Sequence, residues 1–144
     1  IAGYVFHIGL FVVVFFSVPH ILLIKNVLGV SWPGLPSALV DATAVLTLIA
    51  LLAVLVNRIT DPVKRFLSGI EDYLVWALTA LPVLTGYLAF NHLTPDYTFM
   101  LALHILSVEL LLAALPFTKL MHAVTFLAAR WYTGDIMGRK GVAS

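Results

Sequence analysis

Four long apolar stretches constrain the fold of this chain of 144 residues more than any other feature. A helix needs about 20 apolar residues to cross a bilayer, and only helices and closed barrels satisfy the backbone there. We therefore predict four transmembrane helices, at about residues 2–24, 38–56, 70–90 and 97–130. The breaker-rich segment Gly29–Pro36 separates the first two helices, and Thr94-Pro95-Asp96 is a start signal for the fourth.

The composition supports a membrane location. Hydrophobic residues make up 62% of the chain and charged residues 10%, whereas a soluble domain is about half apolar and about a quarter charged. A chain this small cannot hide so much apolar surface from water. We expect one domain over residues 1–144, an all-α integral membrane protein built as a four-helix transmembrane bundle.

Charge and cysteine content exclude several functions. A net charge of +1 argues against nucleic acid as a partner. The chain has no cysteine, which excludes disulfides, iron–sulfur ligation and covalent attachment of haem. A redox cofactor would have to be held non-covalently, with histidine as its best available ligand.

The basic residues predict an orientation. Four crossings put seven of the eight on one side, which the positive-inside rule assigns to the cytoplasm: Arg58, Lys64, Arg65, Lys119, Arg130, Arg139 and Lys140. We therefore expect a multi-pass protein of the cytoplasmic (inner) membrane, with its carboxyl end in the cytoplasm. Ile1 would also begin on that side, without Met, so we expect that a fifth, N-terminal helix precedes it.

Four of the five histidines fall on the first and fourth predicted helices: His7 and His20 on the first, His104 and His122 on the fourth. Ionisable residues within spans are costly and usually mark function. These two helices run antiparallel, because three crossings separate them. Rises of about 20 Å from 7 to 20 and about 27 Å from 104 to 122 place His7 at the depth of His122. His20 likewise falls at the depth of His104.

Two histidines at each of two depths are what two bis-histidine b haems require. A neutral imidazole binds iron through one nitrogen, while the other donates to a nearby acceptor. We predict that His7 and His122 bind the iron of a cytoplasmic-side haem. His20 and His104 would bind that of an outer-side haem. The alternative is that these histidines only pack. His92 reads as a solvated helix end, and it is the reserve ligand if His20 is not one.

Rotation along the first helix is an awkward point for this pairing. Thirteen residues, from 7 to 20, turn a straight helix by about 220°, so the two histidines would not share a face. Pro19 directly precedes His20 and can kink the helix. On the fourth helix, 18 residues are about five turns, so His104 and His122 face one direction.

Small and basic residues near the histidines are candidate supports. Gly3, Gly9 and Gly86 would let a flat porphyrin approach the backbone, although small residues also simply pack membrane helices. Lys119 and Arg130 are possible contacts for a haem propionate, or else positive-inside anchors. Both interpretations stay open at each position.

Two motifs resemble the gamma subunit of respiratory nitrate reductase and related quinone-linked di-haem cytochrome b subunits. His104 and the run Leu115–His122 (LPFTKLMH) are similar to the family's histidine, apolar run and Pro-Phe-Ser/Thr-Arg/Lys-Leu-x-His. Phe6–Gly9 (FHIG) is similar to the Phe-His-x-Gly that opens its first haem-binding helix. Members typically have five helices, which agrees with a further helix before Ile1.

The resemblance implies ligands and partners. In that family His7 would pair with His122, and His104 with a second histidine of the first helix. Members place that histidine where this chain has Ser17, so His20 is the nearest candidate. Membrane quinol would be oxidised near the outer haem, and electrons would pass to a cytoplasmic iron–sulfur subunit and through it to a catalytic subunit. The reverse direction is equally compatible.

Two other hypotheses compete with this one. A different transmembrane cytochrome b, such as a hydrogenase or formate dehydrogenase anchor, would place its ligands elsewhere on the helices. A non-haem membrane anchor or metal-ion carrier would use the histidines for packing or metal binding, and it predicts no haem absorbance. In the favoured interpretation the chain is the electron-transfer subunit of a quinol-linked oxidoreductase, without a soluble catalytic site of its own.

Overall fold

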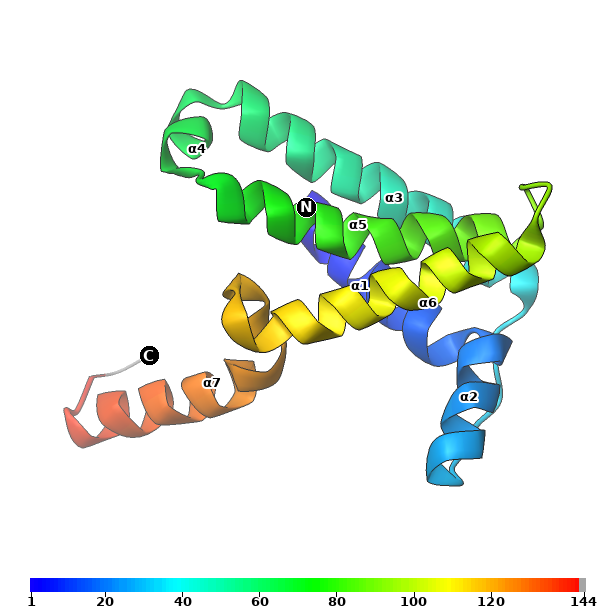
Figure 1. Cartoon of the computed structure of the whole chain (residues 1–144). Coiled ribbons are helices and arrows are strands. Elements are labelled where there is room, and N and C mark those ends of the chain that lie inside the picture. The colour runs from blue at the N-terminus through cyan, green and yellow to red at the C-terminus, as the bar shows by residue number, and fades with distance from the viewer. Residues whose placement is uncertain (143–144) are drawn as a thin grey trace.

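The computed structural model describes residues 1–142. It is 84% helix, with no strand among those residues (Figure 1). The helices in chain order are α1 (Ala2–Phe16), α2 (Val18–Leu28), α3 (Ser37–Thr60), α4 (Pro62–Leu67), α5 (Ile70–Phe90), α6 (Tyr97–Ala114), the 3₁₀ turns η1 (Leu115–Phe117) and η2 (Lys119–Met121), and α7 (His122–Arg139).

Helix α3 holds the small core together. It packs on both α1 and α5, and α5 packs on α6. Figure 1 shows α3, α5 and α6 side by side, with α1 running obliquely across them. The buried apolar side chains lie mainly on α3 and α5: Ile21, Val40, Ala44, Ala50, Leu51, Val83 and Ala89.

Most of the large apolar side chains are exposed. On α6, for example, Ile105, Leu110 and Leu112 are each at least half exposed. Three helices (α3, α5 and Tyr97–Phe117) are long and apolar enough to cross a membrane, or four if the bent pair α1–α2 is one span. So much exposed apolar surface needs lipid or a partner to cover it. The helices are therefore compatible with a multi-pass membrane protein, while the side on which the carboxyl end lies stays a prediction.

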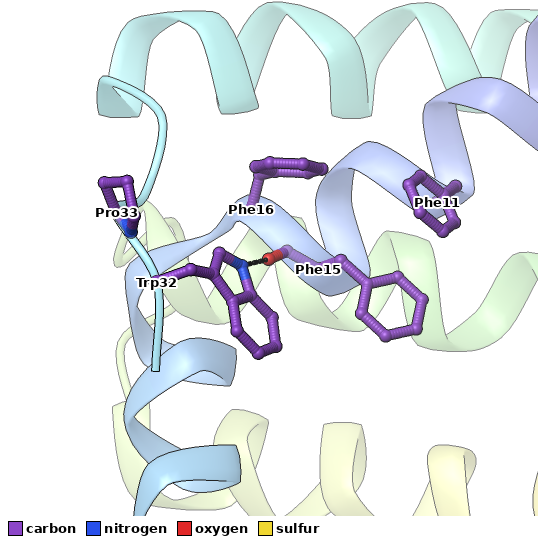
Figure 2. Close-up of a pocket in the computed structure, with 5 residues that line it drawn as sticks. All are labelled: Phe11, Phe15, Phe16, Trp32 and Pro33. Carbon is purple, nitrogen blue, oxygen red and sulfur yellow. Dashed lines mark hydrogen bonds between the residues drawn. The ribbon is translucent and has the colours of Figure 1, made fainter. Parts of the chain in front are cut away.

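The first predicted helix is not continuous. It breaks at Ser17, whose backbone is extended (φ −78°, ψ 136°), and α1 and α2 are bent by 59°. Pro19 has no N–H to donate to the carbonyl of Phe15, four residues earlier, and its ring would clash with that carbonyl. The indole N–H of Trp32 donates to the Phe15 oxygen instead, at 2.6 Å (Figure 2). The expectation of one helix over 2–24 was therefore wrong.

Beyond the break, the chain runs away from α1 along α2, and the segment after α2 runs back to the end of α1. Gly29 ends α2 with a left-handed backbone (φ 75°), a conformation that glycine adopts without steric cost. The returning segment reaches the end of α1, where the N–H of Leu35 donates to the carbonyl of Phe16 at 3.0 Å. Gly34 lies against α2, because a Cβ there would stand 2.9 Å from Val18. These contacts fix the direction of α2, which carries His20.

The fourth predicted helix, 97–130, is also interrupted. Pro116 cannot continue the helical hydrogen bonds, and the chain passes through η1, an extended Thr118 and η2 before α7 begins. The Thr118 hydroxyl donates to the carbonyl of Ala114 at 2.9 Å and accepts from the N–H of Leu120 at 3.3 Å, so the interruption is hydrogen-bonded. Helix α7 lies apart from the other helices (Figure 1) and has no buried residue.

The contact of α1 with α3 depends on one glycine. Gly9 is the buried residue of α1, and a Cβ there would run into the hydroxyl of Thr47. Thr47 is fully buried, with 0% exposure, and its hydroxyl donates to the carbonyl of Thr43 at 2.7 Å. Of the two interpretations open for Gly9, helix packing is the one that its surroundings support.

Candidate functional site

The first histidine pair, His7 and His122, joins the start of α1 to the start of α7. The two ring centroids lie 6.1 Å apart with the ring planes at 71°. Nδ1 of His7 is 2.6 Å from the carbonyl oxygen of Gly3, one turn earlier. Nδ1 of His122 is 2.6 Å from the carbonyl oxygen of Lys119. Each ring is thus held by the backbone just before it in the chain.

The second histidine pair, His20 and His104, joins α2 to α6. Its ring centroids are also 6.1 Å apart, with the planes at 25°. Both residues are half-buried. Nδ1 of His20 lies 3.1 Å from the carbonyl oxygen of Val13 and 3.0 Å from the hydroxyl of Ser17. The carbonyl of Val13 is one that the break in the first helix brings within reach of this ring.

Two neighbouring residues of α5, Thr85 and Gly86, contact the ring of His104. Nδ1 of His104 lies 3.3 Å from the hydroxyl oxygen of Thr85. That hydroxyl donates its own proton to the carbonyl of Leu81 at 2.7 Å, so its oxygen is free to accept. A Cβ on Gly86 would stand 2.8 Å from Cε1 of His104, closer than real Cβ contacts come. Of the two interpretations of Gly86, its surroundings support helix packing, because the space beside it is filled by the His104 side chain of α6.

The four rings share one pattern of contact at Nδ1. In each of them Nδ1 faces an oxygen, and for three of the four that oxygen belongs to a backbone carbonyl, which can only accept. In His7, His20 and His122, which face carbonyls, Nδ1 therefore carries the proton of the neutral ring, and Nε2 keeps its lone pair. This is the tautomer of an imidazole that binds a metal through Nε2 while a second hydrogen bond fixes its orientation.

The separation within each pair fits a shared metal. If both rings of a pair held one ion through a nitrogen, metal–nitrogen bonds of about 2.0 Å and about 1.1 Å from nitrogen to ring centre would put the two centroids at most ~6.2 Å apart. Both observed separations are 6.1 Å. Haem iron takes its remaining ligands from the porphyrin, so two histidines complete it.

The surroundings of the pairs fit a flat group better than a bare ion. Among residues 1–142, no three or more His, Cys, Asp or Glu side chains lie close enough together to hold a metal ion. A zinc site typically takes three or four protein ligands. Within the same part of the chain, α2 does not pack closely on α6, nor α1 on α7, although the histidines of each of these two helix pairs meet. The residues present therefore fit haem.

The other predicted site residues lie away from the pairs or are already bonded. His92 is exposed at the end of α5 with a left-handed backbone (φ 51°), and its ring packs on Tyr97 with centroids 4.6 Å apart. Nζ of Lys119 lies 2.9 Å from a carboxylate oxygen of Asp72. Arg130 is exposed on α7 and, within residues 1–142, makes no hydrogen bond or ion pair. The propionate contacts of Lys119 and Arg130 stay predictions.

Sequence reasoning missed Thr85. A weak signal was present, because Thr85 directly precedes Gly86 on the helix that neighbours His104. The carbonyl acceptors of Gly3, Val13 and Lys119 carry no sequence signal, since every residue has a carbonyl.

A shallow apolar hollow of about 380 Å³ lies beside the break in the first helix (Figure 2). Its lining is aromatic, apart from a proline: Phe11, Phe15, Phe16, Trp32 and Pro33. The Trp32 indole, whose N–H donates to the Phe15 carbonyl at the break, also forms one wall of the hollow. The hollow is therefore a product of the kink, and its chemistry suits a hydrocarbon or ring surface.

Comparison with known proteins gives a match in sequence and none in structure. A protein of Nitratidesulfovibrio vulgaris (strain Hildenborough), whose name states no activity, is 37% identical over 145 residues. The match includes all of this chain, and the chain spans 64% of the relative's length. No family model matches, and no solved structure matches.

Proposed function

We propose that this chain is the membrane subunit of a respiratory complex, in which two b haems carry electrons between membrane quinol or quinone and a cytoplasmic iron–sulfur partner. The observation that carries the proposal is the repeated geometry of the two histidine pairs. One pair joins α1 to α7 and the other joins α2 to α6, with ring centroids 6.1 Å apart and an oxygen within hydrogen-bond distance of Nδ1 in every ring. A packing role alone does not require the same spacing and the same contact at Nδ1 twice.

The chain's own residues would supply ligation and orientation at both pairs, and partial burial at the second, since His7 and His122 are exposed. Bound haem would supply one-electron redox chemistry. The first pair, His7 and His122, would hold one haem at the basic end of the molecule, beside Arg58 and Lys119. The second pair, His20 and His104, would hold the other towards the opposite end. Two haems at different depths would be two successive redox centres for electrons that cross the bilayer.

The quinone link and the iron–sulfur partner rest on the resemblance to nitrate reductase gamma subunits. The cysteine-free sequence agrees with iron–sulfur centres on a separate chain. The terminal acceptor, whether nitrate, a sulfur compound or a disulfide, belongs to the catalytic subunit in this proposal.

The test is reduction of membranes that contain the intact complex. Dithionite should give the absorbance of reduced b haem, and anaerobic addition of a naphthoquinol analogue should reduce the same haem. Membranes from a deletion strain are the control. The quinone link would be contradicted if dithionite reduces the haem, while neither the quinol analogue nor the reduced iron–sulfur partner reduces it. Absence of b haem would leave the non-haem anchor or metal-ion carrier.

A further inference from the structure

Lys119 is bonded at three of its groups, and one of these bonds holds a histidine of the first pair. Its backbone N–H donates to Oε1 of Glu71 at 2.9 Å. Its ammonium lies 2.9 Å from Oδ1 of Asp72. Its carbonyl oxygen accepts from Nδ1 of His122 at 2.6 Å. The orientation of the His122 ring is therefore linked through one residue to two carboxylates on α5.

Asp72 is a firm anchor for this link. Its side chain is only 10% exposed. Oδ2 accepts from the N–H of Gly69 at 2.9 Å, and Oδ1 lies 3.2 Å from the guanidinium of Arg58 on α3. A carboxylate that is fixed by several donors and shielded from water binds a cation more strongly than a surface pair does. Asp72 thus ties the segment around Lys119 to both α3 and α5.

Few other contacts hold His122 in place. The interruption after α6 removes helical continuity between His104 and His122. Helix α7 has no buried residue, and it packs on η2. By contrast, η2 packs on α5, where Glu71 and Asp72 lie. The position of His122 therefore depends on how η2 is held.

We propose that Glu71 and Asp72 are positioning residues that set the orientation of His122 as a haem ligand by fixing Lys119. The proposal rests on the proposed function, in which His122 binds haem. It also gives Lys119 a role different from a propionate contact: its carbonyl orients the ligand, while its charge is satisfied by carboxylates.

The experiment compares haem loss from each site separately. A His104→Ala chain should keep only the haem of the first pair, and a His122→Ala chain only that of the second. Transfer of haem from each purified complex to a haem-scavenging protein then measures one site at a time. Removing the groups that orient a metal-ligating histidine typically weakens metal binding about 10- to 100-fold. We expect Glu71→Ala/Asp72→Asn to speed haem loss by that factor in the His104→Ala chain, and to leave it unchanged in the His122→Ala chain.

Asp61→Asn is the matched control. Asp61 lies at the same end of the molecule, where it caps α4, and hydrogen bonds from the Lys64 backbone and side chain hold its pKa below the usual range. It is thus a charged carboxylate that has no contact with Lys119. This variant should leave both rates unchanged. Glu71→Gln keeps an oxygen that can accept from the N–H of Lys119. Its rate of haem loss should therefore stay close to the wild-type rate, whereas Glu71→Ala should lose haem faster.

Equal acceleration at both sites, or no acceleration at the first, would overturn the proposal. A measurement without haem separates this failure from that of the proposed function. In the haem-free full chain in detergent, ¹⁵N spectra of the imidazoles report which nitrogen carries the proton. We expect His122 to hold its proton on Nδ1 in the wild type and to lose this preference in Glu71→Ala/Asp72→Asn. An unchanged tautomer would refute the positioning role even if no haem binds.

Discussion

His20 lies beside His104, with 6.1 Å between ring centroids, because the first helix breaks three residues before it. On a straight helix the thirteen residues from 7 to 20 would rotate His20 by about 220° from His7. The 59° bend at Ser17 removes that constraint. The second histidine pair therefore depends on the kink as well as on the histidines.

Restoring continuity to the first helix should separate the second pair. In Pro19→Ala/Trp32→Phe, residue 19 gains an N–H and the carbonyl of Phe15 loses its indole donor, so the helical bond between them can form. We expect loss of one haem per chain, measured as pyridine haemochrome. Pro62→Ala, at the start of α4, is the control and should keep both haems. Retention of both haems in the double variant would show that the kink does not set the pair.

Thr85 should matter to haem retention, unlike a similar threonine on the same helix. Thr85→Val removes the acceptor for Nδ1 of His104, and we expect the haem of the second pair to leave about 10- to 100-fold faster. Thr85→Ser should restore the rate, since it keeps the hydroxyl. Thr79→Val is the control, because Thr79 is buried on α5 and bonds only to the carbonyl of Val75. Similar rates in both valine variants would count against a role for Thr85.

Gly86→Ala should displace the imidazole ring of His104, which packs against Gly86. The new Cβ would lie 2.8 Å from Cε1 and 3.1 Å from Nδ1 of His104, so the ring must move. We expect faster loss of the second haem, by about 10-fold or more, with the first haem unaffected. Gly134→Ala on α7, where a Cβ meets nothing within 4 Å, should change neither rate. Unchanged retention in Gly86→Ala would mean that this contact on α5 is not specific.

Gly9→Ala tests helix packing rather than haem binding. The added methyl group would overlap the buried Thr47 hydroxyl, and overpacking of this kind costs about 1–3 kcal/mol. The free energy of unfolding in detergent should fall by that amount. Gly3→Ala meets no atom within 4 Å, so it should instead raise stability by about 0.5–1 kcal/mol. Equal stabilities would argue against close contact between α1 and α3 at Gly9.

Sequence patterns predicted much of the architecture, because hydrophobic length and helix breakers are local properties. The expected helix at 70–90 coincides with α5, and the start near Tyr97 follows an Asp96 side chain that caps α6. Depth along antiparallel helices was enough to pair His7 with His122 and His20 with His104, the same residues that the structure brings together. Ligation of haem by these pairs is still a prediction.

What the sequence did not predict depends on contacts between distant segments. Pro19 and Pro116 signalled a possible distortion, but how far each helix bends is set by partners such as Trp32 and Thr118. The acceptors that orient the histidines are mostly backbone carbonyls, which no pattern marks. Lys119 was interpreted from the sequence as a possible propionate contact or a positive-inside anchor, because its carboxylate partner Asp72 lies 47 residues earlier in the chain.

The most direct test of the central claim is the amount of b haem per chain in the purified complex, for the wild type and for alanine variants of each histidine. We predict two haems in the wild type and one in each variant of His7, His20, His104 and His122. His92→Ala should keep two. A wild type without b haem would contradict the account as a whole. If His20→Ala keeps both haems while His92→Ala loses one, the second pair has been assigned to the wrong histidine.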